Sequence, residues 1–235
     1  MQATVVWDSA VAVVAAIVLC AAQAYAVGVT PATALGAVAG VGLVVALCAM
    51  VMTLGVRSCG PADRVTLARV VLIGGCAGFA GPILSGAVPA RPWWLLVLLV
   101  PALLLDAVDG QVARRTGTSS PAGAKLDGEV DAAALMVLSV IAISSLGWWV
   151  LAIGLMRYAF WAAGLFQPRL RGQLPFSQFR RVAAGLQGAS LAVALTSVVP
   201  LPDARALVAV ALALLLVSFG RDVVWLVGRR PVSTG

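Results

Sequence analysis

The chain consists of eight long apolar segments, separated by short breaks that contain glycine, proline or charged residues. A helix needs roughly 20 consecutive apolar residues to cross the hydrocarbon core of a bilayer, and each segment is close to that length. We therefore expect an all-α, polytopic integral membrane protein with about eight transmembrane helices. The expected spans are Val5–Val27, Pro31–Val56, Val65–Val88, Pro92–Ala113, Ala124–Leu146, Trp148–Phe166, Val182–Val199 and Ala204–Val227.

The composition excludes the soluble globular class. Only 11% of the 235 residues are charged and 62% are hydrophobic, whereas roughly 25% of the residues in a soluble domain are charged. The chain also has no histidine. A Ser-His-Asp triad and a histidine-ligated metal are therefore excluded.

The positive charges predict how the chain is oriented in the membrane. Of the sixteen Lys and Arg residues, Arg91 and Arg205 lie at breaks on one side of the predicted bundle and Arg157 lies inside a span. The other thirteen fall at or near breaks on the opposite side. Cytoplasmic loops carry such an excess, so we expect both termini in the cytosol, in the plasma membrane of a bacterium. The net charge of +7 is then explained by orientation, and no nucleic-acid partner is inferred.

The first span allows one alternative. Ala22-Gln23-Ala24 and Ala24-Tyr25-Ala26 resemble the small-residue sites at which signal peptides are cleaved. Cleavage there would leave seven spans and an external N-terminus. However, the residues before the apolar stretch include Asp8 and no Lys or Arg, which is the reverse of the start of a signal peptide.

Acidic residues are scarce and clustered: five of the nine lie between Asp106 and Asp131. Asp106 and Asp109 end the fourth span, and Asp127 and Asp131 begin the fifth. A short polar turn joins the two helices as an antiparallel hairpin. The spacing of four residues places Asp127 and Asp131 on one stripe, whereas Glu129 lies on roughly the opposite side of the helix. We expect the four aspartates to converge and Glu129 to face away.

Four adjacent carboxylates cannot all stay ionised unless cations hold them. Arg114, Arg115 and Lys125 are nearby and offer one solution. The other is a hard divalent metal, because ligation by carboxylates alone suits Mg²⁺, Mn²⁺ or Ca²⁺ rather than zinc. A pair of such ions commonly clamps a phosphate during a displacement reaction.

The motif Asp106-x2-Asp109-Gly110-x2-Ala113-Arg114-x8-Gly123-x3-Asp127-x3-Asp131 resembles the signature of the CDP-alcohol phosphotransferases at every fixed position. The resemblance implies a six-helix core in residues 61–235, preceded by two added transmembrane helices in residues 1–60. It also implies an enzyme of phospholipid biosynthesis in which the hydroxyl of a second alcohol displaces CMP from a CDP-linked lipid, such as CDP-diacylglycerol. The site would face the cytosol, and homodimers are common in the family.

The resemblance also assigns roles to the matching residues. Divalent metal, two ions of Mg²⁺ or Mn²⁺, would be held by Asp106, Asp109, Asp127 and Asp131. Asp127 and Asp131 would be the catalytic residues, with Asp131 a metal ligand, the general base, or both. The nucleotide would be bound by Gly110, Ala113, Arg114 and Gly123. Thr66 is added as a nucleotide-binding candidate, because the first core helix of the family often begins with a Thr and an Arg, as Thr66 and Arg69 do here. The alternative for these two residues is a capped helix start at the membrane interface, with the arginine reaching toward water.

Arg157 is the one charge well inside a span. A lone arginine in hydrocarbon is costly, so it should face a carboxylate, carbonyl groups or a wet cavity. We predict either a site for the small alcohol acceptor, with or without a phosphate group, or a structural partner. Arg181 and Gln187 are weaker candidates for the same acceptor.

Two other functions compete with the transferase. The aspartates could form the ion site of a membrane cation transporter or channel, which would move metal and release no CMP. The chain could also retain the motif for binding alone. Against a transporter, the aspartates lie at one membrane face and no second acidic pair marks a path across the bilayer.

Overall fold

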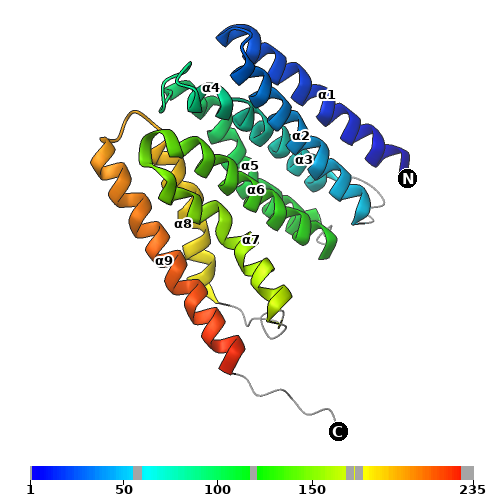
Figure 1. Ribbon diagram of the computed structural model, residues 1–235. Coiled ribbons are helices and arrows are strands. Elements are labelled where there is room, and N and C mark those ends of the chain that lie inside the picture. Colours follow the sequence, from blue (N-terminus) through cyan, green and yellow to red (C-terminus); the bar gives the residue numbers. More distant parts are fainter. Residues whose placement is uncertain (1, 55–59, 117–120, 168–171, 173–176, 229–235) are drawn as a thin grey trace.

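The computed structural model describes residues 2–54, 60–116, 121–167, 172 and 177–228, and within these the side chains of 4–54, 60, 63–106, 122–167, 172, 177–180 and 182–228. These residues form helices and connecting turns, with no strand among them (Figure 1). The α-helices are α1 (Gln2–Val27), α2 (Pro31–Thr53), α3 (Pro61–Gly78), α4 (Ala80–Leu84), α5 (Leu96–Thr116), α6 (Pro121–Leu146), α7 (Leu151–Phe166), α8 (Gln178–Ala194) and α9 (Leu201–Gly228). Two 3₁₀ turns, η1 (Trp93–Leu95) and η2 (Trp148–Val150), precede α5 and α7.

The structure confirms an all-α polytopic membrane protein. Each predicted span overlaps helix in the described residues, and six helical stretches there are long and apolar enough to cross a membrane. The predicted fourth and seventh spans fall outside those six. The fourth contributes a shorter apolar stretch, Trp93–Asp106, and the seventh corresponds to α8, which has 17 residues.

The predicted third span is broken where α3 gives way to α4. Pro82 lies in the short helix α4 and has no N–H to donate to the carbonyl of Gly78, four residues earlier. The hydrogen bonding changes at this point from a spacing of four residues to one of three: the N–H of Phe79 donates to the carbonyl oxygen of Cys76 at 3.1 Å. One apolar segment therefore forms two helices.

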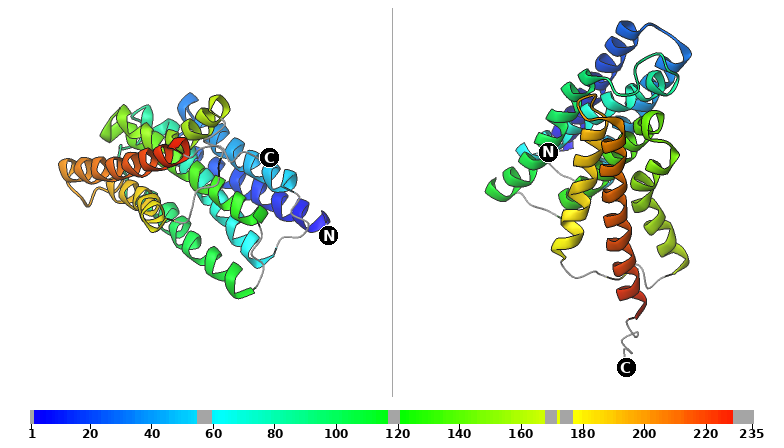
Figure 2. Two further views of the ribbon diagram at one scale, coloured as in Figure 1. Left: turned by 90° about the horizontal axis from the view of Figure 1, so that it is seen from below. Right: turned by 90° about the vertical axis from the view of Figure 1, so that its left-hand side faces the viewer.

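Helix α3 is the central element of the bundle. It packs against α1 and α2 on one side and against α5 and α6 on the other. The α1–α2 hairpin forms one edge of the molecule, and α8 and α9 lie toward the other edge (Figures 1 and 2). Helix α1 begins, α2 and α5 end, and α6 begins at the same end of the bundle (Figure 1). We call this the α5–α6 end.

Glycines bring α2 and α3 into close contact. The motif Gly36-x3-Gly40 on α2 faces Gly74-x3-Gly78 on α3. A Cβ atom at Gly36 would lie 2.2 Å from the carbonyl oxygen of Gly78, and one at Gly40 would lie 2.4 Å from that of Gly74. Association of helices in lipid depends on close van der Waals packing, which small residues permit. The two backbones therefore touch without intervening side chains.

Helix α1 is also fixed to α3. Near one end, Arg64 Nε donates to Asp8 Oδ2 at 3.1 Å. Near the other, the buried Gln23 donates from Nε2 to the carbonyl oxygen of Gly75 at 3.1 Å. Polar groups in hydrocarbon need such partners. The first helix is thus an integral part of the bundle.

The two arginines predicted on the side opposite to most positive charge cap helices there. Arg91 donates to the carbonyl oxygen of Ala194, the last residue of α8, at 2.7 Å, and to that of Val199, in the turn before α9, at 2.6 Å. Arg205 donates to the carbonyl oxygen of Ser145 at 3.1 Å, near the end of α6. The last carbonyls of a helix lack partners within the helix and carry partial negative charge. These arginines satisfy those groups.

We expect Gly40→Ala to lower the melting temperature of the purified protein by about 2–10 °C, because overpacking costs about 1–3 kcal/mol. The added methyl group would meet the backbone of α3. Gly42→Ala is the matched control on the same helix, since a Cβ there has no atom within 4 Å. Thermal unfolding in detergent measures both. Equal melting temperatures for the two variants would show that the close contact does not stabilise the bundle.

Candidate active site

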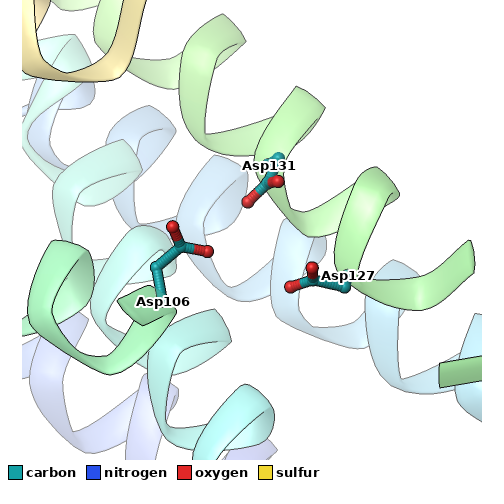
Figure 3. A group of neighbouring side chains, drawn as sticks. All are labelled: Asp106, Asp127 and Asp131. Carbon is teal, nitrogen blue, oxygen red and sulfur yellow. The ribbon is translucent and has the colours of Figure 1, made fainter. Parts of the chain in front are cut away.

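Three carboxylates meet at the α5–α6 end. Asp106 belongs to α5, and Asp127 and Asp131 lie one turn apart on α6. One oxygen of each can be chosen so that all three oxygens lie within 4.8 Å of one another. Figure 3 shows the three side chains directed toward a common gap between the two helices. The predicted convergence is confirmed for these residues, here called the Asp triad, whereas the side chain of Asp109 lies outside the described residues.

A buried arginine joins the Asp triad. Arg69, on α3, bonds to Asp106 through Nη1. Its Nη2 lies 2.8 Å from Asp127 Oδ1 and 3.1 Å from Asp131 Oδ1. The side chain of Arg69 is 3% exposed, whereas the three carboxylates are about half exposed. One guanidinium therefore connects three helices.

The formal charges leave this cluster negative. Three ionised carboxylates carry three negative charges, and Arg69 supplies one positive charge. An excess of two negative charges therefore remains, which equals the charge of one divalent cation.

The donor set fits a hard metal. Oxygen atoms of carboxylates are the preferred ligands of Mg²⁺, Mn²⁺ and Ca²⁺, and the triad offers three of them from two helices. Their partial exposure leaves a route for an ion to enter. Asp106, Asp127 and Asp131 could therefore hold a divalent cation, although the number and identity of ions stay predictions.

A cavity of about 520 Å³ extends from the Asp triad between α3, α5, α6 and α8. Among the described residues that line it, the charged ones are the triad and Arg69. One and two turns farther into the bundle its walls become apolar, and this part is lined by Ile73, Cys76, Leu99, Leu103, Ala134 and Leu138. Asp131 and Leu138 are separated by about 10 Å along α6, at 1.5 Å per residue. The cavity thus has a polar mouth and an apolar interior.

The predicted nucleotide-binding residues lie on α3, α5 and α6. Thr66 is buried in α3, one turn before Arg69. Gly123 lies in the first turn of α6, one turn before Asp127. The backbone of α5 includes Gly110, Ala113 and Arg114, but their side chains lie outside the described residues. Their roles stay predictions.

Arg157, on α7, contacts a face of α6 other than the one that carries the Asp triad. Its Nη2 is 2.5 Å from Glu129 Oε1, and the two residues line a second cavity with aromatic residues of α7. A carboxylate partner is one of the surroundings predicted for Arg157, and Glu129 does face away from the triad as predicted. Arg157 is not among the described residues that line the first cavity, so the geometry does not support its role in acceptor binding there.

Two further polar residues hold α8 against α9. Gln187 is fully buried and donates to the carbonyl oxygen of Ala211 at 2.7 Å. Arg180 pairs with both carboxylate oxygens of Asp222 at 3.2 Å. These contacts give Gln187 a structural role that its position in the sequence did not reveal. The side chain of Arg181 lies outside the described residues.

The chain belongs to the CDP-alcohol phosphatidyltransferase family, whose model matches residues 61–220. The matched region includes the Asp triad and Arg69 and begins where α3 begins. The α1–α2 hairpin precedes it.

A more specific similarity covers a short part of the chain. The archaetidylinositol phosphate synthase of Aeropyrum pernix is 48% identical over 59 residues, which are 22% of this chain and 29% of that enzyme. The chain thus matches less than a third of the length of this relative. No solved structure matches the chain.

The Arg157–Glu129 pair yields a prediction that separates the two roles considered for Arg157. In a double-mutant cycle of Arg157→Gln and Glu129→Gln, thermal unfolding should show a coupling of about 0.5–1 kcal/mol, because the pair is partly exposed. Additive effects would show that the pair contributes nothing. A rise in the KM of the acceptor with Arg157→Gln, not shared by Glu129→Gln, would instead support acceptor binding.

Proposed function

We propose that this protein is a membrane-bound CDP-alcohol phosphatidyltransferase of phospholipid biosynthesis. The hydroxyl of a second alcohol displaces CMP from a CDP-linked lipid, with CDP-diacylglycerol the first candidate donor. The observation that carries the proposal is the Asp triad at the mouth of a cavity with an apolar interior. The family match over residues 61–220 supports it.

The two parts of the cavity suit the two parts of a CDP-linked lipid. The pyrophosphate would lie at the mouth beside the carboxylates and their metal, and the start of the lipid chain would enter the apolar interior. Arg114 would donate paired hydrogen bonds to the pyrophosphate, as guanidinium groups do. Gly110, Ala113 and Gly123 have small side chains that would let the nucleotide approach the helices closely. Thr66 is a further candidate on α3.

The reaction forms one phosphorus–oxygen bond and breaks another. The acceptor oxygen attacks the phosphorus that carries the lipid, while the bond from that phosphorus to the bridging oxygen breaks and its electron pair leaves with CMP. The acceptor proton passes to the carboxylate of Asp131, the proposed general base. Divalent metal at Asp106, Asp109, Asp127 and Asp131, proposed as two Mg²⁺ or Mn²⁺ ions, would supply positive charge that stabilises the phosphate oxygens and the departing CMP.

We further propose that the α5–α6 end faces the cytosol, with both termini on that side. The excess of Lys and Arg at the breaks that the sequence predicts on one side of the bundle supports the orientation. The acceptor is then a soluble alcohol, and the relative from Aeropyrum pernix makes inositol phosphate the first phosphorylated acceptor to test. A homodimer is part of the same proposal.

A cation transporter is the competing function. The Asp triad is the one cluster of three or more potential metal ligands found in the described part of the chain. The interior of its cavity is apolar, which does not offer a cation a path across the bilayer. These observations favour the transferase.

The activity is tested by CMP formation from CDP-diacylglycerol and a panel of acceptors: inositol phosphate, glycerol 3-phosphate, inositol and serine. We expect CMP formation that requires both acceptor and Mg²⁺ or Mn²⁺. Asp131→Asn should lower the rate at least about 100-fold, because general-base catalysis is worth about 10²–10⁴-fold. Glu129→Gln is the matched control, two residues away on another face of α6, and should retain most activity. Undiminished CMP formation by folded Asp131→Asn would remove Asp131 from the mechanism.

A substitution that narrows the cavity tests whether the lipid chain of the donor binds in its apolar interior. Gly185 lines the cavity from α8, and a Cβ there has no atom within 4 Å, so Gly185→Leu places its side chain in the cavity without a backbone clash. We expect the KM for the CDP-lipid to rise about tenfold, a typical effect of a few methylene groups on a pocket. Gly42→Leu, on α2 in similarly open surroundings, is the control. An unchanged KM in Gly185→Leu would show that the lipid binds elsewhere.

A further inference from the structure

Arg69 binds the same carboxylates that a metal would need. Its two terminal nitrogens contact all three residues of the triad, and at Asp127 and Asp131 both contacts go to Oδ1 through Nη2. The guanidinium thus bridges the carboxylate of α5 and those of α6, in the gap toward which all three side chains point (Figure 3). Arg69 acts here as a cation ligated by the triad.

A guanidinium and a metal ion shared by the two helices would compete for the same three carboxylates. Each oxygen bound to Mg²⁺ lies about 2.1 Å from the ion, so two such oxygens are at most about 4.2 Å apart. The ligand oxygens of the triad already lie within 4.8 Å of one another. An ion shared by α5 and α6 would therefore displace the nitrogens of Arg69 from their carboxylate partners.

Burial makes the interaction of Arg69 with the triad strong. A guanidinium that is 3% exposed has lost most of its hydration, and its carboxylate partners compensate for that loss. The metal-free protein is stabilised by this network, so an incoming ion has to replace it. The affinity for metal is then lowered by whatever free energy Arg69 contributes to the metal-free state.

The structure has space next to Arg69 into which its side chain could move. The cavity of about 520 Å³ adjoins its side chain, and an arginine side chain has several rotatable bonds. A guanidinium released from the triad would remain at the mouth of the cavity, where the proposed substrate carries phosphate. Paired hydrogen bonds to phosphate are a favoured geometry for arginine.

We propose that Arg69 is the resident counter-ion of the Asp triad, which divalent metal displaces on binding. Arg69 is thus a positioning residue that holds the carboxylates together without metal and sets the affinity of the site for it. The inference rests on the proposed function for the presence of metal, but it concerns metal binding in the absence of substrate.

The test measures Mn²⁺ binding to the purified full-length protein in detergent, with no nucleotide, from the electron paramagnetic resonance signal of free Mn²⁺. Arg69→Gln keeps a polar, uncharged side chain at this position and removes the competing charge. We expect its Kd for Mn²⁺ to fall at least about tenfold, within the 10–100-fold range by which residues around a metal site alter affinity. Arg69→Lys keeps the positive charge but lacks the planar guanidinium. Its Kd for Mn²⁺ should lie between the values for Arg69→Gln and the wild-type protein.

Arg157→Gln is the matched control, because it removes another guanidinium that is paired with a carboxylate of α6 but does not touch the triad. Its Kd should stay within about twofold of the wild-type value if local competition governs affinity. If Arg69→Gln does not fold, the comparison of Arg69→Lys with wild type decides the question. An unchanged or higher Kd in the folded Arg69 variant, or no Mn²⁺ binding by any variant, would overturn the inference.

The failure of this inference and that of the proposed function are distinguishable. The binding experiment contains no donor or acceptor, whereas the transferase is tested by CMP formation in the wild-type protein. Tighter Mn²⁺ binding in Arg69→Gln without CMP formation in wild type would refute the transferase alone. CMP formation with unchanged metal affinity in the variant would refute the role of Arg69 alone.

Discussion

The contact of one buried guanidinium with three carboxylates determines how the α5–α6 end is assembled. Arg69 is 3% exposed in a membrane protein, and it contacts Asp106, Asp127 and Asp131 from a third helix. A buried charge without a partner is far more costly than a buried pair. Helices α3, α5 and α6 therefore have to present these residues at one depth, and the cavity that we assign to the lipid donor opens beside them.

The opposite side of α3 serves packing. Close contact between the glycine motifs of α2 and α3, together with the hydrogen bond from Gln23 to Gly75, attaches the N-terminal hairpin to the helix that carries Arg69. The hairpin lies outside the region matched by the family model. The hairpin contacts the face of α3 that does not line the cavity. Its position is therefore suited to holding α3 in place and not to contact with the substrate.

Much of the fold and part of the site were predictable from the sequence. Apolar length identified the helices, and the period of the α-helix placed Asp127 and Asp131 on one stripe with Glu129 on another face. The glycine motifs of α2 and α3 were readable as well, yet their meaning depended on knowing that the two helices are neighbours. The partner of Arg157 was not predictable for the same reason: helical periodicity gives the faces of one helix but not the helix that each face meets.

The sequence alone determined the chemistry available to this protein: helices in hydrocarbon, no histidine, and aspartates gathered at the ends of two successive helices. Those features depend on local order along the chain, so they can be derived without coordinates. The tertiary structure decided that Arg69 meets the aspartates and that the space beside them is apolar inside. Arg69 and Asp131 are 62 residues apart, and the distance between such residues is set by the mutual packing of three helices. That packing depends on side-chain fit over many residues, which no single motif encodes.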